Sequence, residues 1–311
     1  MKLSIVTTLY QSSSYVEEFY IRITKEAKKI TDDYEIIFVD DGSPDDSLQK
    51  ALALHEKDNK IIVIELSRNF GHHKAIMTGL LHTNGEYVFL IDSDLEEEPE
   101  LLGKLWDELH KEKDLDVVYG VQERRKGRWF EKFTGSLFWK LFNKLAHVEI
   151  AENPLTVRLM KKKYVISLLK FKEKELFLAG VFQLVGFKQK PFSINKKIKD
   201  STTYNFLQKM KLLNNAIVSF SSFPLYLSFY LGTTISIFSF LYGLYLIVNR
   251  LFYNTVTSGW TSLMVSIWFL SGVLLLTIGI LGLYISKIFQ EVKNRPIVEK
   301  KFYGKNNEQS E

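Results

Sequence analysis

Two long runs without a charged residue, in the last third of the chain, constrain its fold more than any other feature. The first is FPLYLSFYLGTTISIFSFLYGLYLIV (residues 223–248) and the second is SLMVSIWFLSGVLLLTIGILGLYIS (residues 262–286). About 20 helical residues are enough to cross a hydrocarbon core about 30 Å thick. We therefore expect two transmembrane helices, with a buried helical hairpin of a soluble protein as the less favoured alternative.

Basic residues lie outside the two runs and are sparse between them. The flanking set is Lys209, Lys211, Lys287, Lys293, Arg295, Lys300 and Lys301, whereas the connection (residues 249–261) carries only Arg250. The positive-inside rule then places residues 1–211 and a basic tail, residues 287–311, in the cytoplasm and the connection outside. The first ten residues read as a β-strand and not as a signal peptide. These features predict a multi-pass protein of the cell (inner) membrane with both termini cytoplasmic.

The net charge of +5 does not indicate nucleic-acid binding. The excess of lysine sits beside the apolar runs and at residues 161–163 and 196–199, which favours membrane lipid headgroups or phosphate-bearing ligands as partners. The chain has no cysteine, so disulfides and thiolate metal sites are excluded. Assembly into homo-oligomers is an option that the sequence leaves open.

The first 200 residues alternate β-type and helical patterns. Apolar runs predict five strands, near residues 3–10, 34–40, 60–66, 87–91 and 116–121. Helical periodicity predicts helices near residues 16–30, 74–82 and 100–111, one more helix beginning at residues 43–46, and a capping box between Ser14 and Glu17. This alternation is typical of an α/β fold with a mostly parallel sheet.

Polar clusters follow three of the predicted strands. They are Asp40-Asp41-Gly42, residues 68–71 (RNFG) and Asp92-Ser93-Asp94. In parallel α/β sheets, ligands bind at the carboxyl ends of the strands, so the three clusters should meet. A dinucleotide dehydrogenase is excluded because the first strand is not followed by a glycine-rich turn, and no P-loop is present.

Asp92 and Asp94 are candidate metal ligands. Alternate side chains of an extended chain point the same way, and two facing carboxylates are stabilised by a hard cation such as Mg2+ or Mn2+. Glu96 is a candidate third ligand. Glu97, Glu98 and Glu100 are expected in water at the start of the next helix.

Two further segments have more than one interpretation. His72 and His73 are either exposed residues at a helix start or donors to a sugar or phosphate. Residues 127–145 form an amphipathic pattern of aromatic and basic residues, either facing the core or lying on the membrane surface, and residues 204–220 are a second candidate for such a surface helix.

Eight segments in order resemble glycosyltransferase family 2, and specifically the polyprenyl-phosphate (dolichol-phosphate or bactoprenol-phosphate) sugar transferases with two C-terminal membrane helices. They are VTTLYQSSSYVEEF, YEIIFVDDGSPDDS, LSRNFGHHKAIMTGL, GEYVFLIDSDLEEEPE, VVYGVQERRKG, VRLMKK, GFKQKPF and LGLYISKIFQEVKNRP. The resemblance covers nearly the whole chain.

The resemblance implies a GT-A nucleotide-diphospho-sugar transferase fold and a metal-dependent, inverting enzyme. Asp92 and Asp94 would bind the metal and Arg158 would compensate phosphate charge, so these three are the implied catalytic residues. The implied nucleotide-sugar site comprises Thr8, Leu9, Tyr10, Asp40, Asp41, Arg68, Asn69, Gly71, Lys74, Ser93 and Arg158. Of these, Asp40 and Asp41 would contact the base and the ribose.

Charge development explains why such residues suit sugar transfer. The leaving nucleoside diphosphate gains negative charge, which a divalent metal and an arginine stabilise, and a phosphate acceptor needs little general-base help.

This chain departs from the family pattern at Glu96, commonly Gln, at Thr156, where the bacterial branch often has an acid, and at Ala179. The alternatives are therefore transfer to a lipid-linked saccharide or other envelope glycan, and a catalytically silent membrane partner that binds nucleotide sugar.

Overall fold

The computed structural model describes residues 1–122, 154–173, 178–194, 223–253 and 259–304. The chain forms two compact units. The first contains Met1–Asn205 and Arg295–Glu311, and the second contains Phe206–Asn294. The two predicted amphipathic helices, residues 127–145 and 204–220, lie outside the described residues.

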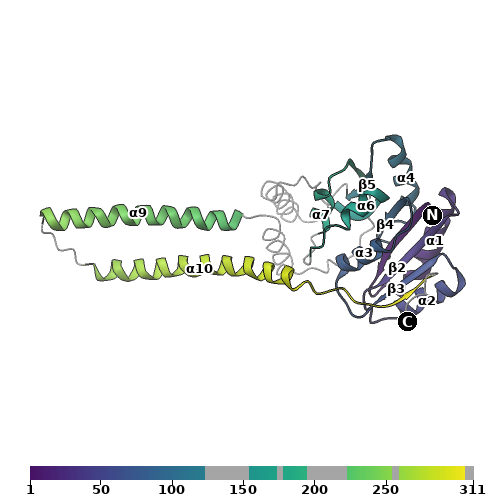
Figure 1. The fold of residues 1–311 in the computed structure, drawn as a ribbon, viewed down its shortest axis with the longest axis horizontal. Coiled ribbons are helices and arrows are strands. Elements are labelled where there is room, and N and C mark those ends of the chain that lie inside the picture. The colour runs from purple at the N-terminus through teal and green to yellow at the C-terminus, as the bar shows by residue number, and fades with distance from the viewer. Residues whose placement is uncertain (123–153, 174–177, 195–222, 254–258, 305–311) are drawn as a thin grey trace. The chain divides into compact units, whose positions relative to one another are not determined.

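The first unit is built on a mixed sheet of eight described strands in the order β7-β5-β6-β4-β1-β2-β3-β8 (Figure 1). The strands are β1 Leu3–Leu9, β2 Tyr34–Asp40, β3 Ile61–Leu66, β4 Tyr87–Leu90, β5 Val117–Gln122, β6 Pro154–Lys161, β7 Gln189–Ile194 and β8 Glu299–Tyr303. The central strands β4, β1, β2 and β3 are parallel, β6 and β8 run antiparallel to their neighbours, and β5 pairs in parallel with β7. The α/β prediction with a mostly parallel sheet is confirmed.

Helices cover both faces of the central strands. They are α1 Val16–Ile30, α2 Ser47–Lys57, α3 His72–Leu81, α4 Leu101–Lys111, α6 Lys162–Leu168 and α7 Leu178–Leu184. Alternate strand residues such as Ile5 and Phe38 join the apolar sides of α1 and α4 in one buried cluster. Residues of the opposite parity, such as Val6 and Val39, face α3. Strand alternation thus divides the apolar side chains between two helical layers.

The element boundaries correct three local predictions. Tyr15 is the N-cap of α1 and makes no side-chain capping bond, so the predicted Ser14 capping box does not form. The second helix begins at Ser47 and not at residues 43–46, because the Asp45 carboxylate accepts bonds from Ser43 and Ser47 and holds a turn before the helix. The third correction concerns the tail: residues 299–303 form β8 at the edge of the sheet, where a separate basic tail was expected.

The second unit contains two long apolar helices, α9 Phe223–Tyr253 and α10 Trp260–Lys293. Both are long and apolar enough to cross a membrane, over Pro224–Tyr242 and Val265–Lys293. Large apolar side chains such as Phe238 and Trp268 lie exposed on them. Such surfaces are stable in lipid and costly in water.

Candidate functional site at the carboxyl ends of the parallel strands

The three predicted polar clusters do meet at one edge of the sheet. Strands β4, β1, β2 and β3 are neighbours in that order, so their carboxyl ends lie side by side. Hydrogen bonds join the turns that follow: Ser93 Oγ donates to the Thr8 carbonyl at 2.9 Å, and the Asp41 N–H donates to the Leu9 carbonyl at 3.0 Å. The turns after β4 and β2 are therefore each hydrogen-bonded to a backbone carbonyl near the end of β1.

Asp92 and Asp94 lie just beyond the end of β4. Ser93 between them is buried, whereas both aspartates are partly exposed, and the Asp92 side chain is 26% exposed. One oxygen of Asp94, Oδ1, accepts the Glu96 N–H at 3.1 Å. The pair thus presents oxygen ligands to the solvent side of the sheet edge.

The predicted third metal ligand is not gathered with this pair. Across the part of the chain that the structure describes, no group of three or more His, Asp or Glu side chains is arranged to hold a metal ion. Glu96 contributes its backbone N–H to the turn after Asp94. Asp92 and Asp94 are oxygen donors of the kind that a hard divalent cation takes, and Glu96 stays a predicted third ligand.

Asp40 and Asp41 have different partners. Asp40 is 2% exposed; its Oδ2 accepts the Ser43 N–H at 3.3 Å, while its buried Oδ1 has no hydrogen-bond partner. Burial, with the negative charges of Glu65 and Asp41 as smaller causes, raises the pKa of Asp40 to about 6. An unsatisfied buried acceptor is costly, so Oδ1 is the atom of this turn best suited to receive a donor from a ligand.

The Asp41 carboxylate holds the next turn in place. Its two oxygens accept the N–H groups of Phe70 and Gly71 at 2.7 and 3.0 Å. The turns also approach closely at Gly42, where φ is 62° and a Cβ atom would lie 2.6 Å from the carbonyl carbon of Arg68. Asp41 is therefore a residue that shapes the site, and its predicted contact with the ribose stays a prediction.

The turn of residues 68–71 carries exposed polar groups. The Arg68 guanidinium lies over the Phe70 ring, 4.3 Å from its centroid, and the Asn69 side chain is exposed. Gly71, at a φ of 100°, is the N-cap of α3, and Lys74 follows in its first turn, partly buried. These groups are positioned to meet an anionic ligand at a helix start.

His72 is an exposed residue at the start of α3, and its side chain also lies close to two of the predicted site residues. Its Nδ1 lies 3.1 Å from Thr8 Oγ1, and its Nε2 lies 3.4 Å from Asp92 Oδ1. The imidazole thus connects the ends of β1 and β4. The sequence singled out His72 but offered no sign of these two partners, because both are distant along the chain.

Residues 8–10 divide between the core and the site. Leu9 is fully buried in the core, so only its backbone faces the neighbouring turn. Thr8 is nearly buried and contacts His72, whereas Tyr10 is largely exposed. Of the three predicted donor-site residues, Thr8 and Tyr10 therefore present side chains there.

Arg158, which was expected to compensate phosphate charge, is buried beside the end of β4. It pairs with Leu90 of β4, its Nε and Nη2 donate to the carbonyls of Thr156 and Leu155 at 3.1 Å each, and it is 3% exposed. Its guanidinium carbon lies 3.1 Å from the ring centroid of Phe182. Burial lowers the pKa of Arg158 to about 10, which leaves it protonated at neutral pH. The positive charge of Arg158 therefore lies at the end of β4, next to the Asp92–Asp94 turn.

Glu97 corrects the interpretation of the acidic run. It is 1% exposed, so the expectation that it lies in water is wrong. Leu95 has a φ of 58°, and this left-handed turn directs the chain back toward the protein after Asp94. Burial lowers the pKa of Arg158 and the charge of Glu97 opposes that shift, so the two opposite charges interact. Glu100 pairs with Arg22 of α1 at 2.6 Å.

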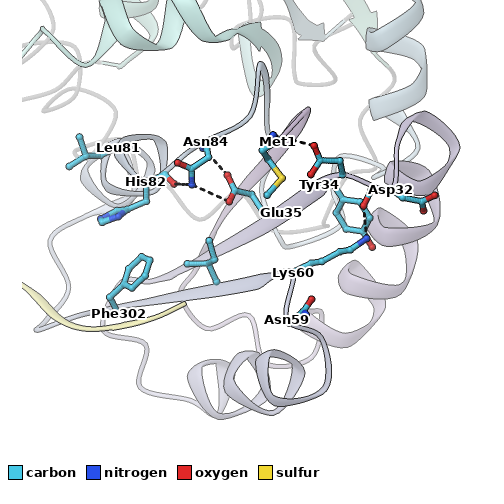
Figure 2. A pocket seen from close by; sticks show the side chains of 12 residues that line it. Met1, Asp32, Tyr34, Glu35, Asn59, Lys60, Leu81, His82, Asn84 and Phe302 are labelled. Carbon is cyan, nitrogen blue, oxygen red and sulfur yellow. Dashed lines mark hydrogen bonds and ion pairs between the residues drawn. The ribbon is translucent and has the colours of Figure 1, made fainter. Parts of the chain in front are cut away.

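A cavity of about 570 Å³ lies at the opposite, amino end of β2 and β3 (Figure 2). Its polar groups bond to one another: Glu35 accepts from the Asn84 N–H at 2.8 Å, and Lys60 donates to the Asp32 carbonyl at 2.6 Å. Glu35 and Lys60 are therefore already engaged with neighbouring groups. The polar clusters that the sequence predicted lie at the other ends of the strands, and we take those ends as the candidate site.

Comparison with known proteins finds relatives over nearly the whole chain. The family model described as Glycosyl transferase family 2 matches residues 4–215. A protein of Mycobacterium tuberculosis (strain CDC 1551 / Oshkosh), whose name places it among glycosyltransferases, is 49% identical over 305 residues, covering 98% of this chain and 89% of that protein. The SfII prophage-derived bactoprenol glucosyl transferase of Shigella flexneri is 32% identical over 308 residues, covering 98% of this chain and 99% of that protein.

Among solved structures, the chain is similar to glucosyl-3-phosphoglycerate synthase from Mycobacterium tuberculosis in complex with Mn2+, uridine-diphosphate and phosphoglyceric acid. The TM-score is 0.47 and the identity 17%, with 70% of this chain and 76% of that chain covered.

Proposed function

The chain belongs to glycosyltransferase family 2 and has its GT-A-like α/β fold, and from this premise we propose that it transfers a sugar from a nucleotide-diphosphate-sugar donor to polyprenyl phosphate. The single observation that carries the proposal is the meeting of Asp40, Asp92 and Asp94 at the carboxyl ends of neighbouring parallel strands. The two apolar helices and the bactoprenol named for the Shigella flexneri relative support a lipid acceptor.

Asp92 and Asp94 fit a divalent ion. They are partly exposed oxygen donors just beyond the end of β4, and Mg2+ or Mn2+ takes such ligands while leaving room for phosphate oxygens. When bound, the ion would neutralise the negative charge that develops on the departing nucleoside diphosphate. His72 contacts Asp92 and holds one of its oxygens, Oδ1, toward the end of β1.

The other donor-site residues orient the nucleotide. Asp40 Oδ1 would accept a hydrogen bond from the base, and Asp41 keeps the turn of residues 68–71 in position through its two backbone bonds. Arg158 would compensate phosphate charge through its positive charge at the end of β4, beside the Asp92–Asp94 turn. Since the acceptor phosphate is already nucleophilic, positioning supplies most of the rate, and in-line attack inverts the anomeric centre.

The proposed arrangement in the cell follows from the charge distribution. Residues 1–211 form the cytoplasmic catalytic domain, residues 223–248 and 262–286 span the inner membrane, and residues 249–261 connect them outside. The product would be a lipid-linked sugar for cell-envelope glycan or lipopolysaccharide synthesis or modification. Membrane lipids surround the two spans.

The test is transfer by the purified full-length protein in lipid nanodiscs. A panel of nucleotide sugars is offered with polyprenyl phosphate and Mg2+ or Mn2+, and products are identified by mass spectrometry. Asp94→Asn should lower the rate about 100-fold or more because it removes charge at the leaving group. Glu98→Gln, the matched control, removes one charge from the same acidic run and should leave the rate unchanged.

Three outcomes would contradict parts of the proposal. Full activity in EDTA and in Asp94→Asn would exclude the metal role. A disaccharide-lipid without any polyprenyl monophosphate sugar would replace the acceptor with a lipid-linked saccharide. Binding of nucleotide sugar without transfer to either acceptor would identify a catalytically silent partner.

A further inference from the structure

The last described strand of the sheet, β8, comes after both apolar helices in the sequence. β8 follows α10 along the chain and pairs antiparallel with the edge strand β3, with Ile64 opposite Phe302 and Glu65 opposite Lys301 (Figure 1). The same strand β3 borders β2, where Asp40 lies opposite Glu65. β8 is therefore one strand away from the candidate donor site.

Lys300 of β8 forms an ion pair beside Asp40. Its Nζ lies 2.5 Å from Glu65 Oε1, and the Glu65 side chain is only 11% exposed. Burial is the main cause that raises the pKa of Asp40, and the negative charge of Glu65 adds to the rise. The charge of Lys300 thus balances a carboxylate that would otherwise add to the negative potential around Asp40 and Asp41.

The residue before β8 holds the adjoining turn. The Ser67 N–H donates to the Val298 carbonyl at 2.9 Å, directly before residues 68–71. The far end of that turn is held by Asp41, which accepts the N–H groups of Phe70 and Gly71. The turn is therefore fixed at both ends, once from β2 and once from the segment that leads into β8.

We propose that β8 is part of the donor-binding edge and that Lys300 is a positioning residue, acting through Glu65 on Asp40 and its nucleotide ligand. The inference rests on the proposed function, because it assumes that a nucleoside diphosphate binds at these strand ends. Such a ligand carries negative charge, so an unbalanced Glu65 next to its site would weaken binding. A strand that only protects the sheet edge would act on stability and not on affinity.

The test measures binding of UDP, GDP, CDP and TDP, each with Mn2+, to the purified full-length protein by isothermal titration calorimetry. Lys300→Met should weaken the binding of the preferred nucleotide about threefold to tenfold, as expected for one unbalanced charge near the ligand. Lys300→Arg should bind as the wild type does. Lys301→Met is the matched control: it removes the same charge from the next residue, whose ammonium lies over the Tyr303 ring, and should not change affinity.

A double variant separates charge balance from packing. Adding Glu65→Gln to Lys300→Met should restore affinity, because no unbalanced carboxylate then remains beside Asp40, and thermal unfolding of each variant reports its stability. Equal affinity of the wild type and Lys300→Met would overturn this inference alone, as would an equal loss in Lys301→Met. A wild type that binds none of the four nucleotides would overturn the proposed function itself.

Discussion

At the scale of single residues, Asp40 and Asp41 show how two adjacent acids acquire different roles. Asp41 is saturated by backbone N–H groups of the turn after β3. Asp40 keeps one buried oxygen without a hydrogen-bond partner. The difference arises because successive side chains at the end of a strand point to opposite sides. A buried oxygen without a hydrogen-bond partner lowers the stability of the folded protein, and it leaves an acceptor that a ligand can use.

The first prediction concerns the stability of Asp40→Asn as a function of pH. Burial raises the pKa of Asp40 from 3.8 to about 6, so the folded state holds an extra proton between these values. The stability that this group contributes is fully present below about pH 4 and is lost as the pH rises through about 6. Asparagine removes the buried charge, so the variant should be more stable at pH 7.5 by on the order of 1 kcal/mol.

Thermal unfolding of wild type and Asp40→Asn at pH 7.5 and near pH 4 checks this prediction. The gain should vanish at the lower pH, where Asp40 of the wild type is protonated. An equal difference at both pH values would show that the effect is packing and not charge. Nucleotide affinity of the variant should fall, because the amide offers one acceptor where the carboxylate has two.

The sequence predicted the residue-scale features that depend on a local pattern and missed those that depend on distant partners. The buried Val88, Phe89 and Leu90 of β4, followed by the partly exposed Asp92, agree with the apolar run and the polar cluster in the sequence. The burial of Glu97 depends on the left-handed conformation of Leu95 and on the charge of Arg158, neither of which a local pattern contains. His72 likewise finds Thr8 and Asp92 only when β1 and β4 are adjacent.

At the scale of elements, close packing of α3 on the sheet positions the turn before it. A Cβ atom added to Gly79 would lie 2.5 Å from Val6 Cγ1 and 2.9 Å from Val39 Cγ2. The helix therefore approaches β1 and β2 more closely than any side chain at this position allows. Because His72 begins the same helix, the packing of Gly79 also helps to position His72 relative to the carboxyl ends of the strands.

The second prediction compares two helical glycines. Gly79→Ala should destabilise the protein by about 1–3 kcal/mol, because the methyl group overpacks a filled interface. Gly103→Ala in α4 is the matched control: its Cβ would meet only Glu26 Oε2 at 3.6 Å, so the better helix propensity of alanine should stabilise by about 0.5–1 kcal/mol. Chemical unfolding of both variants measures the difference, and the same sign in both would contradict the packing argument.

Prediction from sequence was reliable for the central strands and poor at the sheet edges. β1, β2 and β3 are apolar runs buried on both faces, which leaves a strong signal. β7 and β8 are short and partly exposed, and neither contains a long apolar run, so their patterns do not differ from those of loops. Their places were set by pairing with strands far away in the chain, which no local period encodes.

At the scale of the whole molecule, the chain leaves the first unit and later returns to it. Residues from Arg295 onward belong to the same compact unit as Met1–Asn205. If the intervening helices cross a membrane, the number of crossings must then be even. The return of β8 to the sheet thus supports the topology proposed from the basic flanks, by an argument independent of charge.

The third prediction tests this topology with single cysteines, which is straightforward because the chain has none of its own. Lys57→Cys is placed on the exposed end of α2, and Ser258→Cys between the two apolar helices. In intact cells a membrane-impermeant maleimide should label Ser258→Cys alone, and in inverted vesicles Lys57→Cys alone. Labelling of both from the same side would exclude a spanning hairpin.

The pairing of β8 with β3 also determines when the sheet can be completed during synthesis of the chain. The ribosome makes β3 early, but β8 emerges only after both apolar helices have been synthesised. Until then the edge of β3 is open and can pair with another chain. The edge of the sheet that we propose to bind nucleotide is therefore completed only after both apolar helices have been synthesised.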